Sequence, residues 1–87
     1  MQNNSVYPLD YPVEKVVHTT FLKFSINNIM ITLFHSANIF VSLYDETDVI
    51  LDSLILDMSG EAYDLWNSDA YLVEWVRLQI QTMYARI

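Results

Sequence analysis

The chain is 87 residues long, with 53 % hydrophobic residues, 17 % charged residues, no cysteine and a formal net charge of −7. That length accommodates one domain, and that balance of apolar and charged residues excludes an intrinsically disordered chain. Because there is no cysteine, a disulfide framework and a thiolate metal site are excluded as well.

The acidic residues are concentrated in the second half of the chain. Residues 1–44 carry two acids and two lysines, whereas residues 45–87 carry nine acids and two arginines. Phosphate contacts require Lys and Arg, so we expect no direct binding of nucleic acid. The predicted acidic surface consists of Asp45, Glu46, Asp48, Asp52, Glu61, Asp64 and Asp69.

Neither secretion nor a membrane partner is expected. The opening MQNNSVYPLD has no basic start followed by an apolar stretch, as a secretory signal would. Residues 24–44 carry no charge and could span a bilayer by length, but their Asn, Ser and His side chains argue against insertion.

Residues 1–15 are predicted to be an extended arm, and residues 16–87 a single α+β domain. The arm repeats a Tyr-Pro pair at Tyr7-Pro8 and Tyr11-Pro12. Each proline pushes the preceding residue into extended geometry. The arm is too apolar for a free tail, so we expect it to lie across its own sheet or a neighbour.

The segment FSINNIMITLF, residues 24–34, is interpreted as a β-hairpin with a two-residue turn at Asn27-Asn28. A second turn at residues 36–38 would add a third strand. This register gives one aliphatic face and a second face with a cross-strand aromatic row. The predicted row and its neighbours are Phe21, Phe34, Phe40, Met30 and Tyr44.

A charged turn at residues 45–48 is followed by an apolar stretch, residues 49–58, that we predict to be a fourth strand at the sheet edge. Ser59 is expected to cap a short helical turn at residues 60–66. Ser68 is a favourable N-cap for a helix that runs toward the end of the chain. The apolar stripe of that helix comprises Leu72, Trp75, Val76, Ile80, Met83, Tyr84 and Ile87.

These elements predict an α+β fold, an antiparallel meander of three to four strands with a C-terminal amphipathic helix packed on one face. One helix covers one face only. The second apolar face would then be buried by the arm, by a second copy of the chain or by a different protein.

No pattern in the sequence indicates a reaction. His18 and His35 are interpreted as structural residues on the core side of the sheet, because no third ligand has convincing spacing for a metal. The acids of DETDVILD lack the spacing of a calcium loop. We therefore expect no catalytic residue, no cofactor and no metal, and a protein that is not an enzyme.

The segment GEAYDLWNSDAYLVEWV, residues 60–76, alternates aromatic and acidic residues. Its aromatics either anchor the segment on the sheet or form a recognition surface, with Trp66 as a candidate contact. The pattern GE-x-Y-x-x-W followed by D-x-Y-L is similar to the C-terminal segment of small uncharacterised proteins of tailed phages. The resemblance implies a viral context, in the host cytoplasm or the virion, and carries over no catalytic residue.

Two functions are compatible with these features. The first is a non-enzymatic interaction or assembly protein that forms a homo-oligomer, or docks on a larger protein assembly, through its second apolar face. The predicted interface comprises Phe21, Phe34, Phe40, Met30, Tyr44, Tyr7, Tyr11 and Trp66. The alternative is an acidic inhibitor that mimics nucleic-acid phosphates and occupies a basic groove of a host protein.

Overall fold

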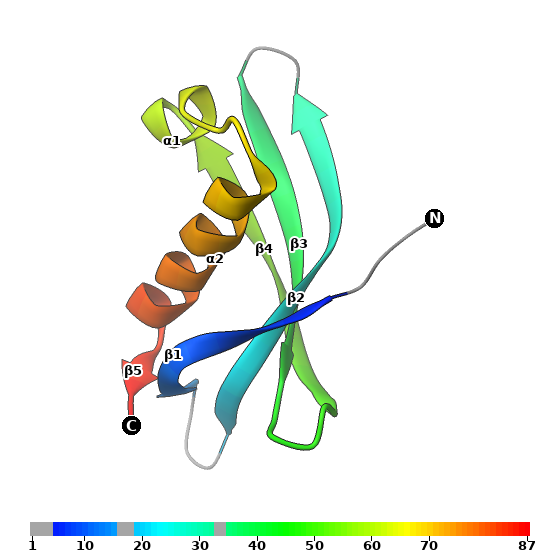
Figure 1. Cartoon of the computed structure of the whole chain (residues 1–87), viewed down its shortest axis with the longest axis vertical. Helices are drawn as coiled ribbons and strands as arrows, with labels where there is room; N and C mark the ends of the chain where they lie inside the picture. The colour runs from blue at the N-terminus through cyan, green and yellow to red at the C-terminus, as the bar shows by residue number, and fades with distance from the viewer. Residues whose placement is uncertain (1–4, 16–18, 33–34) are drawn as a thin grey trace.

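The computed structural model of the chain describes residues 5–15, 19–32 and 35–87. Five strands form one antiparallel sheet in the order β4-β3-β2-β1-β5, and the sheet curls around one side of helix α2 (Figure 1). The elements are β1 (Val6–Glu14), β2 (Thr20–Thr32), β3 (Ser36–Tyr44), β4 (Ile50–Ser59), α1 (Glu61–Asp64), α2 (Asp69–Met83) and β5 (Ala85–Arg86).

This arrangement confirms the α+β class, the antiparallel sheet and the C-terminal helix, but the sheet has five strands rather than three to four. The first extra strand, β1, comes from the stretch interpreted as an arm, and it pairs with β2 and β5. The second, β5, follows α2 and pairs with the end of β1, where Val13 lies opposite Arg86.

The predicted hairpin turn at Asn27-Asn28 is wrong. β2 runs without interruption from Thr20 to Thr32, and its pairing with β3 only shifts register between Ile26 and Asn28. A β-bulge absorbs one extra residue in a strand that carries on past it. The polar side chain of Asn27 accepts a hydrogen bond from Ser25 Oγ at 3.0 Å, so it is satisfied within the sheet.

The predicted second turn at residues 36–38 is also wrong, because these residues begin β3. The chain reverses just before them, where the His35 N–H donates to the Thr32 carbonyl at 2.9 Å. His35 is exposed in this turn and does not lie on the core side opposite Thr20, which pairs with Glu14 instead. His18 and Phe34 lie outside the described residues.

The core lies between the sheet and α2. Alternate residues of β3 point toward the helix and are buried, and the helix contributes one buried stripe, as expected for an amphipathic helix on a half-covered sheet. The buried apolar residues of β3 and α2 are Ala37, Ile39, Val41, Leu43, Leu72, Val76 and Ile80.

The remaining elements agree in part with expectation. β4 is a strand at the sheet edge, as predicted. Ser59 is its last residue and not a cap; Gly60, with φ of 64°, occupies the N-cap position of α1. Ser68 caps α2, since its Oγ accepts from the Tyr71 N–H at 3.1 Å. The helix ends at Met83, short of the predicted end, because the chain then extends to pair with β1.

Candidate interaction surface

The sheet has a second face that points away from α2, called the outer face below. Its central position is Phe40 on β3, which lies between Asn28 of β2 and Ile55 of β4. Residues alternate between the two faces along each strand, so this pairing fixes the other members of the face. They include Met30 of β2, Asn38, Ser42 and Tyr44 of β3, and Ser53 and Asp57 of β4.

Hydrogen bonds among neutral groups occupy the middle of the outer face. The Ser25 and Tyr44 hydroxyls are 2.9 Å apart, and Asn27 Nδ2 donates to Ser42 Oγ. Ser25 is fully buried, and Ser42 is 5 % exposed. Because these polar groups already have hydrogen-bond partners within the sheet, they do not need water as a partner. Removing water from them on binding therefore costs little free energy.

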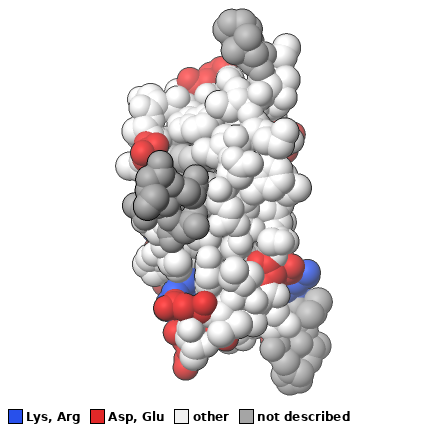
Figure 2. Space-filling model, turned by 90° about the vertical axis from the view of Figure 1, so that its right-hand side faces the viewer, with Lys and Arg blue, Asp and Glu red and all other residues white. Residues whose placement is uncertain are grey.

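Apolar side chains flank this neutral network. Ile55 and Met30 are 59 % and 58 % exposed, and Phe40 is half-buried between their strands. Asn28, Phe40, Ser53 and Ile55 line a hollow of about 590 Å³ on this side. Figure 2 shows the side of the molecule away from α2, where the visible surface beside the grey residues is mostly uncharged and charged residues gather toward the lower end.

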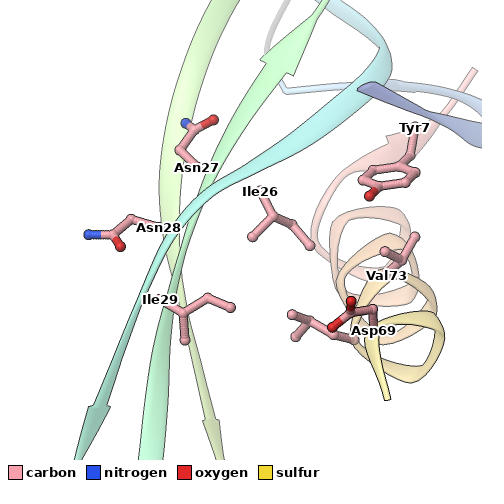
Figure 3. Close-up of a pocket in the computed structure, with 8 residues that line it drawn as sticks. Tyr7, Ile26, Asn27, Asn28, Ile29, Asp69 and Val73 are labelled. Carbon is pink, nitrogen blue, oxygen red and sulfur yellow. The ribbon is translucent and has the colours of Figure 1, made fainter. Parts of the chain in front are cut away.

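A second hollow, of about 400 Å³, lies on the other face, between β2 and the first turns of α2 (Figure 3). Ile26 and Ile29 point into it from β2, whereas the side chains of the two neighbouring asparagines point away from it. Tyr7 and Asp69 supply a phenol and a carboxylate to the lining. This space lies at the end of the core and is separate from the outer face.

Only part of the predicted interface set shares one surface. Met30, Phe40 and Tyr44 lie together on the outer face. Phe21 does not join them: it is fully buried, and its ring meets that of Tyr84 edge-on at 5.4 Å between centroids. The predicted aromatic row is therefore absent from the described residues, because Phe21 and Phe40 lie far apart in the register.

The other predicted contacts belong to the helix side of the sheet. The Tyr7 ring packs on that of Phe24, with 5.5 Å between centroids. Tyr11 lies beneath the Arg86 guanidinium at 4.2 Å, a cation–π contact. Trp66 is half-buried and meets the ring of Tyr63 at 6.3 Å. These rings stabilise the fold locally.

The predicted acidic surface divides into two groups. The first lies around the β3–β4 turn, where Asp48 pairs with Lys23 at 2.6 Å and Asp52 with Lys15 at 2.5 Å. In the same turn the Thr47 hydroxyl, at 2.7 Å, and the Val49 N–H lower the pKa of Asp45. Glu46, also in this turn, is exposed.

The second group, Glu61, Asp64 and Asp69, lies at the opposite end of β4, on and after α1. Between Asp52 of the first group and Glu61 of the second, β4 carries one further acid, the exposed Asp57. At about 3.3 Å per residue, Asp57 lies about 16 Å from Asp52 and about 13 Å from Glu61, beyond the screening length of about 8 Å at physiological salt. The acids along β4 are therefore more widely spaced than the charges of a phosphate backbone.

No protein-family model, no curated protein and no solved structure matches this chain. Among the described residues, no helix is long and apolar enough to cross a membrane. In the same residues, no group of three or more His, Asp or Glu side chains is placed to hold a metal ion.

The outer face also includes residues that the sequence did not single out, above all Ile55 and Ile50. Both are 59 % exposed and lie on β4, opposite Phe40 and Tyr44 respectively. The available signal was the apolar character of the stretch VILDSLILDM at both odd and even positions, which indicates apolar side chains on both faces of an edge strand.

Proposed function

We propose that this protein is a non-enzymatic interaction protein that self-associates through the outer face of its sheet. The observation that carries the proposal is the pairing of Phe40 with the 59 % exposed Ile55 on the face that α2 does not cover. Patches of this kind on small domains mark contact sites with other proteins.

The distribution of charge supports a contact between two copies. Each copy has a formal charge of −7, which would oppose association if it were spread over the contact. Most acids of the second half of the chain instead lie before or after β4. On β4 itself, Asp52 pairs with Lys15, and the exposed Asp57 lies two residues from Ile55 on the outer face. Two copies can therefore meet at Phe40 and Ile55 when the contact leaves Asp57 in solvent or gives it a polar partner.

The biological setting is part of the same proposal. The pattern in residues 60–76 is similar to that of small tailed-phage proteins, which favours an accessory or structural component of a virus. Such a component would act in the host cytoplasm or in the virion. Its partner would be a second copy or a larger assembly that presents a matching apolar surface.

The test is the native mass by light scattering behind size exclusion, in about 0.05 M and 1 M NaCl. We expect a dimer or larger species at both salt concentrations, because burial of apolar surface is not weakened by salt. Phe40→Ser should lower the mass toward that of a monomer. The control, Leu65→Ser, changes a residue that is 54 % exposed and outside the outer face, and should leave the mass unchanged.

A monomer at all concentrations would overturn the proposal. A monomer that captures a basic protein, and releases it in high salt, would favour the acidic inhibitor instead. Circular dichroism of Phe40→Ser must match the parent chain, because only a folded variant reports on the contact.

A further inference from the structure

The outer strand of the sheet, β4, has an edge without a partner among the described residues. Nine of its ten residues pair with β3, all but Leu51, which a register shift leaves out. At the other side of the sheet, the end of β1 is covered by β5. An open strand edge presents unpaired N–H and C=O groups and is a template for pairing with another strand. This inference rests on the self-association proposed above and places the contact at the β4 margin of the outer face, beside Phe40 and Ile55.

The backbone groups that point outward can be assigned. The Ser53 N–H donates to the Oδ1 of its neighbour Asp52 at 2.8 Å, which indicates that it points away from β3. Along an antiparallel strand, alternate residues direct both their N–H and C=O to the same side. Ile55 and Asp57 therefore also direct their backbone groups toward the open edge.

The side chains along this edge permit the approach of another strand. Ile50, Leu51 and Ile55 are 59 %, 40 % and 59 % exposed. Charged side chains are the usual protection of an edge, but the carboxylate of Asp52 is already bound to Lys15 at 2.5 Å. Asp57 is then the one carboxylate of β4 that a partner strand must accommodate.

We propose that β4 pairs antiparallel with β4 of a second copy about a two-fold axis through Ile55, which joins the two sheets into one. In this register Ile55 faces Ile55 of the second copy beside the two Phe40 rings. Leu54 faces Leu56 on the inner side. Ser53 faces Asp57, so that its hydroxyl can donate to that carboxylate, and the two-fold axis repeats this contact.

The positions of the two acids select this register. A slip that keeps every side chain on its face shifts the pairing of the two β4 strands by two residues. Such a slip moves the two-fold axis by one residue. An axis through Leu54 would place Asp57 opposite Leu51, and an axis through Leu56 would place it opposite Ile55. Of these three axes, only the one through Ile55 gives Asp57 a polar partner, and it places no acid opposite another.

The test compares Ile55→Lys with Met30→Lys. These two residues have nearly equal exposure, 59 % and 58 %, and lie on the same face, but Met30 is two strands away from the open edge. Ile55→Lys would place two ammonium groups together at the axis. We expect dimerisation at least about 100-fold weaker in Ile55→Lys, and at least about 10-fold less weakened in Met30→Lys because Met30 lies away from the axis, measured by sedimentation equilibrium.

Amide hydrogen exchange of the unaltered chain supplies the second readout. The amides of Ile55 and Asp57 should be protected at least about 10-fold more at concentrations that favour the dimer, because only edge pairing gives them hydrogen-bond acceptors. A dimer that both lysine variants weaken to the same extent, and in which these amides gain no protection, would overturn the edge pairing while leaving association through the outer face intact. A monomeric chain would overturn both.

Discussion

The two edges of this sheet differ in whether their outward-facing backbone groups have hydrogen-bond partners. Along β1, backbone groups that face outward are bound by side chains of α2: the Pro8 carbonyl accepts from Arg77 Nε at 3.0 Å, and the Asp10 N–H donates to Gln81 Oε1 at 2.7 Å. Proline also lacks the N–H that a further strand would require. This edge is closed to pairing over most of its length.

The end of β1 is closed by the last residues of the chain. β5 pairs with Val13 and Glu14, and the Ile87 N–H donates to the Pro12 carbonyl at 3.1 Å. In contrast, no backbone group of β4 bonds beyond β3 in the described chain, except the Ser53 N–H to its own neighbour. The β1 edge is therefore protected within the fold, whereas the β4 edge is open.

The largest loss of stability should come from truncating Ile80, which packs α2 onto the sheet and so holds the helix whose side chains close the β1 edge. Ile80 is fully buried between α2 and the sheet. We expect Ile80→Ala to lower the free energy of unfolding by about 3 kcal/mol, from lost burial and the cavity left behind. Leu78→Ala, at a position on the same helix that is 49 % exposed, should cost less than about 0.5 kcal/mol.

Urea denaturation followed by circular dichroism measures both values. Equal costs at the two positions would mean that α2 is not anchored on the sheet through this face. The closure of the β1 edge by side chains of that helix would then lose its basis.

A smaller effect is expected from Arg77, which contacts the closed edge directly. Its guanidinium donates to the Pro8 carbonyl, pairs with Glu74 and lies 5.8 Å from the centroid of the Phe24 ring. Its side chain is 16 % exposed. Arg77→Ala should lower the free energy of unfolding by about 1–2 kcal/mol, since a hydrogen bond and ring packing are both lost.

Glu74→Gln serves as the matched change, because it removes the ion pair and leaves the contacts of Arg77 with Pro8 and Phe24. The Glu74 side chain is 54 % exposed, so its cost should stay below about 0.5 kcal/mol. If Glu74→Gln cost as much as Arg77→Ala, the ion pair rather than the strand contact would be the source of the stability.

Elements that depend on local sequence pattern were predicted correctly from the sequence. Elements that depend on pairing between distant segments were not. The helix after Ser68 and the edge position of β4 follow from apolar spacing, capping and flanking acids. The prediction of a hairpin at Asn27-Asn28 is wrong because Asn is suited both to a tight turn and to a bulge. Only the pairing of β2 with β3 distinguishes the two. β5 was missed because a two-residue strand exists only through its contact with β1.

The candidate surface shows the same limit. Alternation placed Met30, Phe40 and Tyr44 together, and the structure keeps them on one face. Phe21 was assigned to that face by the same rule, but its side chain is buried in the core, against the ring of Tyr84 at the end of α2. Alternation along a strand does not show how its end twists toward other parts of the fold.

The smallest effect concerns the ion pair that links the end of β1 to β4. The hydrogen bond from Lys15 holds the pKa of Asp52 below its ordinary value of 3.8, and the Ser53 N–H acts in the same direction. A lowered pKa in the folded state stabilises the fold above the ordinary pKa, and this contribution is lost as the pH falls through the folded-state value. Below about pH 4, the unaltered chain should therefore lose stability more steeply than Asp52→Asn.

At pH 7 the two chains should differ little, because the Lys15 and Asp52 side chains are 45 % and 28 % exposed. Urea titrations between pH 7 and 2.5 measure the slopes, and Asp57→Asn is the control on the same strand. Identical slopes for Asp52→Asn and the unaltered chain would show that the pair does not hold in solution. Asp52 would then be a free charge on β4, which would oppose pairing at the edge that the rest of the strand leaves open.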